Sequence, residues 1–330
     1  VDKGNSVLGI PAYNGGLFKP SAAMDALIVP DKSCEIFKEI AAYDFASEVS
    51  VTVLGHIFEQ SVSDLEELRE LTDLDAFVLK ANALRAVSSG VSGKRKEHGI
   101  VYTPDDITAF IVEQTLGGYL TDRREKLRSN YLNSPPKKKA ADDVIESSYR
   151  SASDLEKKQS GKVRDAKRLT EFLFWNAWRD ELQHIKIVDP ACGSGAFLIA
   201  AFDVLDAEYR QVNEQLQAIT GTRDLFDINR EILNGNLYGV DLNPESIEIS
   251  KLSLWLKTAQ HGKPLQSLEA NLRVGNSLIA EMNGGADFSV RAFDWQGAFA
   301  EVFAAGGFDV VLGNPPYVRM ERIKHVKPYL

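Results

Sequence analysis

The sequence predicts an α/β fold with a doubly wound parallel sheet, preceded by an α-helical domain. Short apolar runs alternate with helical segments after residue 184, and glycine or polar residues follow each run. Helical crossovers between strands are typical of a parallel sheet with helices on both faces. Apolar residues at helical spacing in the first 95 residues indicate the helical domain. We therefore expect three parts, at residues 1–95, 96–183 and 184–330.

Composition and charge are those of an ordinary globular protein. Hydrophobic residues make up 44% of the 330 positions and charged residues 26%, which excludes wholesale disorder. The net charge of −9 excludes a protein coated in basic surface, so any contact with nucleic acid must be local. Local basic runs occur at residues 123–128, 137–139 and 319–327, although such runs are usually solvated faces.

The cysteine content and the hydropathy of the sequence indicate the cellular compartment of the protein. The two cysteines lack the spacing of a disulfide framework or a zinc site, so we expect no metal. No apolar run reaches the length of a membrane span, and the first residues do not resemble a signal peptide. We expect a cytoplasmic protein.

Helices are predicted in the first two parts of the chain. Apolar residues recur at helical spacing at residues 34–43 and 51–60. Pro104, followed by an acidic pair, marks the start of a helix over residues 107–116. Residues 129–162 are polar, with adjacent prolines, consecutive lysines and many serines, so we expect an exposed loop there.

The third part supplies the sheet. Apolar runs predict strands at residues 185–188, 237–240, 272–274 and 308–312. Helices are predicted from Gly195 to about residue 217 and from Pro244 to about residue 260. Because ligands bind beyond the carboxyl ends of strands in such sheets, the residues after each strand are the candidate site.

The first strand ends in the loop DPACGSG at residues 189–195. Gly193 and Gly195 let the backbone approach a ligand closely, although a tight strand-to-helix turn alone would also explain them. The loop lacks the third glycine of a dinucleotide-binding motif and the Lys-Ser/Thr of a phosphate loop, so a pyrophosphate cradle is not expected. The carboxylate of Asp189 instead suits a cationic ligand.

Polar residues follow the second and third strands. Asp241 can accept hydrogen bonds from both hydroxyls of a ribose, but it could equally cap the next helix. Asn276 can offer its amide oxygen to an adenine amino group, while the backbone N–H of Ser277 faces a ring nitrogen. An Asn after a Gly is also an ordinary turn residue.

The fourth strand runs into Asn314-Pro315-Pro316-Tyr317. Neither proline has an N–H, so this loop presents carbonyl acceptors without competing donors. The side-chain oxygen of Asn314 and the carbonyl of Pro315 could accept both protons of an exocyclic amine, which favours a pyramidal, nucleophilic nitrogen. Tyr317 could stack on an extruded base, worth about 1–3 kcal/mol. The structural alternative is a Pro-Pro turn with a packed tyrosine.

Together these motifs resemble the class I S-adenosylmethionine-dependent methyltransferases, in particular the branch with an (Asp/Asn)-Pro-Pro-(Tyr/Phe) loop. Tyr102-Thr103-Pro104 is similar to the segment that adenine methyltransferases of the gamma arrangement place before the glycine loop. The resemblance spans about residues 98–327. It implies transfer of a methyl group from S-adenosylmethionine to N6 of a flipped adenine in double-stranded DNA. No residue is placed to act as a nucleophile, and Cys192 is expected only to fill space.

The resemblance also implies roles for individual residues. The cofactor would be held by Tyr102, Thr103, Pro104, Asp189, Ala191, Gly193, Gly195, Phe197, Asp241, Leu242, Asn276 and Ser277. The target amine would be met by Asn314, Pro315, Pro316 and Tyr317. DNA would be contacted by Arg319, Arg322 and Lys324.

Further segments resemble type IIG restriction-modification enzymes: YNGGLF at residues 13–18, LGHIFE at 54–59 and YVR at 317–319. In those enzymes a helical connector joins a nuclease to the methyltransferase, so residues 1–95 are expected to be such a connector. Only thirteen residues follow Tyr317, where a complete sheet would have three more strands. We therefore expect a fragment that is inactive alone, with any nuclease and the target-recognition domain outside it.

Two other functions stay open. Release-factor glutamine methyltransferases share the Asn-Pro-Pro-Tyr loop, so the acceptor could be a protein glutamine or RNA, although those enzymes lack the Tyr-Thr-Pro segment. Alternatively, the chain could be a non-catalytic DNA-clamping module of a phage-defence complex. Binding of S-adenosylmethionine would separate an enzyme from such a module.

Overall fold

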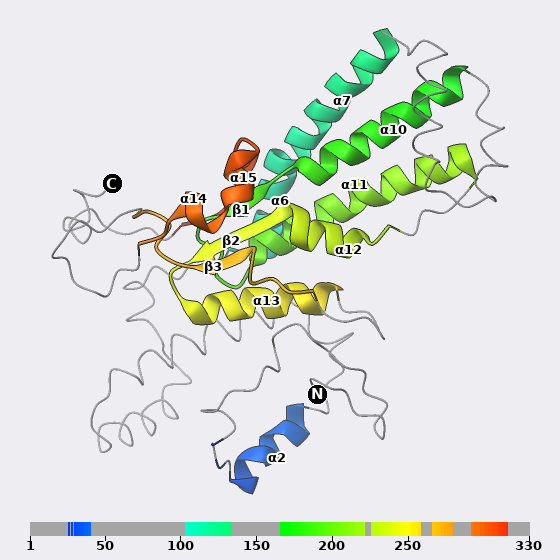
Figure 1. Ribbon diagram of the computed structural model, residues 1–330. Coiled ribbons are helices and arrows are strands. Elements are labelled where there is room, and N and C mark those ends of the chain that lie inside the picture. Colours follow the sequence, from blue (N-terminus) through cyan, green and yellow to red (C-terminus); the bar gives the residue numbers. More distant parts are fainter. Residues whose placement is uncertain are drawn as a thin grey trace.

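The computed structural model describes residues 26, 28, 30–40, 103–133, 166–221, 226–258, 266–279 and 292–315 (Figure 1). Helix α2 (Asp31–Ile40) begins three residues before the predicted helical stretch, directly after Pro30. The expected helix at 51–60 and the boundary near residue 95 lie outside the described residues. So do the site residues Tyr102, Pro316, Tyr317, Arg319, Arg322 and Lys324.

The sheet of the described chain has four parallel strands in the order β3-β2-β1-β4. They are β1 (Ile187–Asp189), β2 (Leu237–Asp241), β3 (Leu272–Val274) and β4 (Val310–Val311). Ile187 pairs with Leu237 on one side and with Val310 on the other. The predicted parallel sheet and α/β class are thus confirmed.

Helices connect these strands. The sheet is crossed by α11 (Ala196–Thr220), α12 (Ile228–Glu231), the π-helical turn η3 (Ile232–Asn236), α13 (Pro244–Thr258), α14 (Trp295–Ala298) and α15 (Ala300–Ala304). Figure 1 shows α13 on one side of the strands and α14 with α15 on the other. The start of α11 at Ala196 fits the prediction, and Gly221, in the left-handed conformation, ends this helix.

Two groups of buried side chains cover the sheet. The larger core cluster contains strand residues such as Ile187 and Leu237 together with side chains of α10 (Ala166–His184), α11 and α13. The smaller cluster is aromatic and joins Val240 to Phe293, Phe299 and Val302. Burial against both groups gives the sheet helical cover on its two faces, as a doubly wound arrangement requires.

A helical layer precedes the sheet. Helix α6 (Asp105–Val112) continues through the π-helical turn η1 (Glu113–Gly117) into α7 (Gly118–Asn133), and α10 (Ala166–His184) leads into β1. Helices α7, α10 and α11 lie beside one another and extend away from the sheet (Figure 1). Their side chains belong to the larger core cluster, so the second and third predicted parts share one hydrophobic core.

The first residues of the polar loop expected at 129–162 are helical, which contradicts the prediction for residues 129–133. Helix α7 continues to Asn133 because Leu127 and Tyr131 pack against the core. The ring of Tyr131 lies 6.2 Å from that of Phe174 in an edge-to-face arrangement. Polar residues at 129 and 130 occupy the exposed side of the same helix. Residues 134–162 lie outside the described parts of the chain.

The basic run at residues 123–128 pairs with glutamates instead of forming an open cationic face. Nε of Arg123 lies 2.8 Å from Glu181, Arg124 lies 2.7 Å from Glu208, and Arg128 lies 3.5 Å from Glu171. These pairs tie α7 to α10 and α11. Within the described ranges, no helix is long and apolar enough to cross a membrane, and no group of His, Cys, Asp or Glu could hold a metal ion.

Candidate functional site

The carboxyl ends of β1 and β2 are joined through Asp241. The backbone N–H of Gly193, in the loop after β1, donates to Oδ2 of Asp241 over 2.9 Å. The N–H of Cys192 donates to the carbonyl of Val240 (3.0 Å), and the N–H of Gly275, after β3, donates to the carbonyl of Asp241 (2.9 Å). Three strand ends predicted to carry site residues are therefore held together at one edge of the sheet.

The glycine loop is shaped by helix α13 as well as by the strand. Gly195 has a φ of +89°, and a Cβ there would lie 3.1 Å from Oγ of Ser250. The same hydroxyl donates to the carbonyl of Gly193 over 2.7 Å. The glycine at 195 is thus needed for close packing against α13, which supports the structural alternative at this position without excluding a ligand.

Asp189 is a buried carboxylate with one oxygen unused. Asp189 is only 1% exposed, and its Oδ1 accepts the N–H of Ala191 over 3.0 Å. Among the described residues, Oδ2 has no hydrogen-bond partner. Burial, reinforced by the negative charge of Asp241, raises the pKa of Asp189 to about 7. A nearby cation would therefore stabilise its ionised form.

Asp241 does not cap helix α13. Its Oδ1 accepts the N–H of Asn243 over 2.8 Å, and the side-chain oxygen of Asn243 accepts the N–H of Glu245 over 2.8 Å. The capping residue is therefore Asn243. Because each oxygen of a carboxylate can accept more than one hydrogen bond, a carboxylate at this position is suited to donors such as ribose hydroxyls. Leu242, directly after it, is 56% exposed and offers an apolar surface beside the carboxylate.

Asn276 and Ser277 form a turn after β3. The side-chain oxygen of Asn276 accepts the N–H of Leu278 over 3.1 Å. This bond is typical of an ordinary turn residue, which was the structural alternative to an adenine contact. The carbonyl of Ser277 accepts the indole N–H of Trp295 over 3.0 Å. These bonds hold the turn in place. The amide oxygen proposed for an adenine already has one donor, so an adenine contact would use its second lone pair.

Asn314 lies at the end of β4, beside the strand that carries Asp189. The N–H of Leu312 donates to the carbonyl of Val188 over 2.9 Å, which extends the pairing of β4 with β1 up to the tetrapeptide. The side-chain Nδ2 of Asn314 donates to Oγ1 of Thr103 over 3.1 Å. The segment that precedes α6 and the tetrapeptide after β4, 211 residues apart, are thus in contact.

Two predicted or candidate residues, Cys192 of the glycine loop and Phe197 in the first turn of α11, are buried in the protein. Cys192 is buried, and burial raises the pKa of its thiol well above the ordinary value. A neutral thiol in this position is a poor nucleophile. Phe197 is 4% exposed and belongs to the larger core cluster, so its side chain serves packing, and its assignment to the cofactor stays a prediction.

Some neighbours of the site were not predicted from the sequence. Ser250 closes on the glycine loop from α13, and Gly313 lies against Asp189. Asp309 accepts the N–H of Lys186 (2.8 Å) and the hydroxyl of Tyr119 (3.1 Å), which fixes the start of β4. Only Gly313 could have been found, because a glycine directly before an extended loop often permits a close approach.

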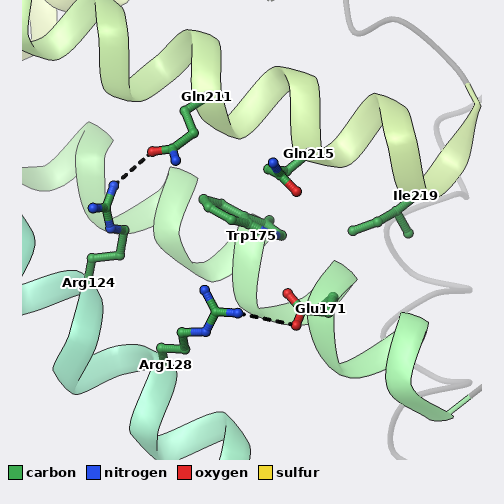
Figure 2. A pocket seen from close by; sticks show the side chains of 7 residues that line it. All are labelled: Arg124, Arg128, Glu171, Trp175, Gln211, Gln215 and Ile219. Carbon is green, nitrogen blue, oxygen red and sulfur yellow. Dashed lines mark hydrogen bonds and ion pairs between the residues drawn. The ribbon is translucent and has the colours of Figure 1, made fainter.

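A separate groove of about 430 Å³ lies in the helical layer, and none of its residues was predicted for the site (Figure 2). It is lined by Arg124, Arg128, Glu171, Trp175, Gln211, Gln215 and Ile219. Figure 2 shows Arg124 bonded to Gln211 and Arg128 bonded to Glu171 across it. Its charged walls are therefore bonded to each other, and the groove marks the seam between α7, α10 and α11.

Comparison with known proteins identifies relatives of this chain. Residues 235–330 match the model of the Eco57I restriction-modification methylase family. The chain is 27% identical over 295 residues to a putative type II restriction enzyme and methyltransferase of Methanocaldococcus jannaschii, which covers 82% of this chain and 21% of that protein. It is 35% identical over 167 residues to the type II restriction enzyme and methyltransferase RM.Eco57I of Escherichia coli, with 45% and 16% covered.

A third relative is named for its specificity. The adenine-specific methyltransferase PglX of Streptomyces coelicolor is 28% identical over 161 residues, which cover 42% of this chain and 13% of that protein. The chain spans about a fifth or less of the length of these three relatives. The family match and the relatives' names confirm the resemblance to adenine-specific methyltransferases of restriction-modification systems.

Proposed function

We propose that this chain carries the cofactor site and catalytic loop of a site-specific DNA methyltransferase. The reaction is methyl transfer from S-adenosylmethionine to N6 of an adenine flipped out of duplex DNA, as the modification activity of a restriction-modification enzyme. The observation that carries the proposal is the position of Asn314, which follows β4 and adjoins the strand that ends in Asp189 and the glycine loop.

The residues at the strand ends fit S-adenosylmethionine. The buried, unpartnered Oδ2 of Asp189 favours a ligand that brings positive charge to this edge, and the cofactor carries an ammonium and a sulfonium. Gly193 and Gly195 both have a positive φ, which allows the loop to turn sharply at the end of the strand where a ligand would lie. When bound, S-adenosylmethionine supplies an electrophilic methyl group on its sulfonium sulfur.

The nucleoside end of the cofactor suits the second and third strand ends. Asp241 ends β2, and each oxygen of a carboxylate can accept more than one hydrogen bond, which suits the two hydroxyls of a ribose. The exposed side chain of Leu242 offers a surface on which an adenine ring can pack. Asn276 and Ser277 occupy a turn fixed by Leu278 and Trp295, which keeps their polar atoms in place for the adenine edge.

The target amine would be held by acceptors. The side-chain oxygen of Asn314 and the carbonyl of Pro315 would accept hydrogen bonds from the two N6–H groups, which directs the nitrogen lone pair out of the purine plane. The N6–CH3 bond would form as the S–CH3 bond breaks, with S-adenosylhomocysteine as the leaving group and one N6 proton released to solvent. Transfer is direct, without a covalent enzyme intermediate, because the buried neutral thiol of Cys192 is unsuited to attack. The reaction is therefore controlled by orientation and electrostatics.

Contacts with DNA are carried over from the resemblance. Tyr317 would stack on the flipped base, and Arg319, Arg322 and Lys324 would meet phosphates next to it. The arginines of α7 are given no such role because they pair with glutamates. Recognition of a DNA sequence is assigned to a target-recognition domain, as the resemblance implies. Cleavage is assigned to a fused or associated nuclease, because two relatives are named both restriction enzyme and methyltransferase.

The test is the substitution Asn314→Ala in the full-length protein. We expect a loss of adenine methylation of about 100-fold or more, as for other groups that stabilise a transition state, with cofactor affinity changed about twofold at most. Asn234→Ala is the matched control, since Asn234 is exposed before β2, at the opposite end of the strands. Unchanged methylation by Asn314→Ala with intact cofactor binding would contradict the proposal.

A further inference from the structure

Thr103 is fixed by the first turn of α6. Its carbonyl accepts the hydroxyl of Thr108 over 3.3 Å, and the N–H of Thr108 donates to the carbonyl of Pro104 over 2.9 Å. Thr108 is 3% exposed. A buried threonine thus holds the backbone on which the Thr103 side chain stands.

Helix α6 is in turn packed on the scaffold of the site. It contacts α11, the helix that follows the glycine loop, and Val112 is completely buried in the larger core cluster. On the other side, Leu312, two residues before Asn314, is 2% exposed and bonded to β1. Thr103 and Asn314 are therefore presented to each other by rigid elements, as precise positioning requires.

The bond between them orients the Asn314 amide. Nδ2 donates to the Thr103 hydroxyl over 3.1 Å, so the amide oxygen faces the other way. Among the described residues, that oxygen has no hydrogen-bond partner. If the amide rotated by half a turn, it would present two N–H donors to the target amine, which is itself a donor in this reaction.

We propose that Thr103 is a positioning residue, whose hydroxyl holds the Asn314 amide in the orientation in which its oxygen faces the target amine. This inference rests on the proposed function and deepens it. The resemblance assigns Thr103 to the cofactor, whereas the structure engages its side chain with the catalytic loop. The two roles predict different kinetic effects, because loss of a cofactor contact weakens cofactor binding and loss of orientation slows the transfer step.

The experiment compares Thr103→Val with Thr103→Ser in the full-length protein. Valine keeps the shape of threonine but cannot accept a hydrogen bond, and serine keeps the hydroxyl. The measurements are the single-turnover methylation rate at saturating cofactor and DNA, the cofactor dissociation constant by isothermal titration, and the melting temperature. Thr115→Val is the matched control, because Thr115 bonds only within its own helical turn and lies outside the proposed site.

The expected result is a split between rate and affinity. Thr103→Val lowers the single-turnover rate about tenfold and leaves the cofactor dissociation constant within about twofold, while Thr103→Ser retains at least about a third of the rate. In the Asn314→Ala background, Thr103→Val causes no further loss, because there is no amide left to orient.

Three results would overturn the inference: a wild-type rate for Thr103→Val, a defect confined to cofactor affinity, or losses that multiply in the double variant. If Thr103→Val unfolds, the serine variant decides, since a rate reduced tenfold by serine contradicts a role for the hydroxyl. Failure of the proposed function is separately visible, because Asn314→Ala alone would then methylate DNA normally. Loss of activity in Asn314→Ala with a normal Thr103→Val overturns only the positioning role.

Discussion

A Cβ atom at Gly313 would stand 2.7 Å from Oδ1 of Asp189, so the chain leaving β4 passes directly against the buried carboxylate. The backbone of Gly313 has a φ of +151°, which residues other than glycine rarely adopt. The residue before the tetrapeptide and the first residue of the glycine loop are therefore in close contact. A substitution at either Gly313 or Asp189 should therefore displace the other residue.

Gly313→Ala is expected to displace the tetrapeptide from the glycine loop. Both the backbone strain and the overlap with Asp189 are unfavourable, so we expect a destabilisation of about 1–3 kcal/mol and a strong loss of methylation. Chemical denaturation measures the first effect. Gly118→Ala is the control, because nothing lies within 4 Å of a Cβ there and alanine favours a helix. Equal stability of the Gly313 and Gly118 variants would contradict the reasoning.

Asp189→Asn is expected to raise stability at high pH in the absence of cofactor. The pKa of Asp189 is raised to about 7, so between about pH 4 and pH 7 the native state retains a proton that the unfolded state loses. Stability contributed by this group therefore falls as pH rises through that window and stays low above it. The asparagine variant lacks this loss, so its melting temperature should exceed that of the wild type more at about pH 8 than at about pH 5.

The control for this comparison is Asp122→Asn, on the exposed side of α7. Its difference from the wild type should not grow over the same range. A melting-temperature difference for Asp189→Asn that is the same at both pH values would mean that the buried carboxyl does not titrate there.

Cofactor binding should become tighter as pH rises, whereas the stability of the cofactor-free protein falls. If the ionised Asp189 favours a cationic ligand, protonation of this carboxyl below about pH 7 weakens binding, by at most about tenfold per pH unit. Isothermal titration of the wild type at about pH 6 and pH 8 measures the change. Asp189→Asn should bind weakly at both values. A dissociation constant independent of pH in the wild type would argue against the carboxylate as the group that senses the cofactor.

The strands and their polar ends could be predicted because their signal is local. Apolar runs followed by Asp189, Asp241, Asn276 and Asn314 place these residues at the carboxyl ends of strands, and parallel pairing brings those ends to one edge. The parallel direction of the strands followed from their alternation with helices. What each carboxylate bonds to, such as Asp241 to the N–H of Gly193, depends on loop geometry that spacing does not determine.

Contacts across the fold could not be predicted. Ser250 meets the glycine loop only because of the rotation of α13 on the sheet, and a serine inside a helix carries no signal for that. The helix predicted over residues 107–116 does not end there, because a π-helical turn (Glu113–Gly117) continues it into α7, and Leu116 and Leu120 are both fully buried. Tertiary packing thus outweighed local propensity.

The pair Arg124–Glu208 should matter more for stability than other ion pairs of the helical layer. Nη1 of Arg124 lies 2.7 and 2.8 Å from the two oxygens of Glu208, and the indole N–H of Trp178 donates to the same carboxylate over 3.1 Å. Because both charged side chains are largely buried, removal of one charge leaves the other unpaired. Glu208→Gln is expected to destabilise the protein by about 1–3 kcal/mol in urea unfolding.

The comparison is Asp206→Asn, which breaks the pair with the largely exposed Arg210, an exposed i,i+4 contact expected to contribute about 0.5 kcal/mol or less. Added salt should weaken the exposed pair and leave the penalty of Glu208→Gln nearly unchanged, since burial limits screening. Cofactor affinity should not change in either variant, because both residues lie in α11 well beyond its start at Ala196, where the glycine loop ends. A small, salt-sensitive effect of Glu208→Gln would show that the arginine is solvated, and would reopen a role for it in binding phosphate.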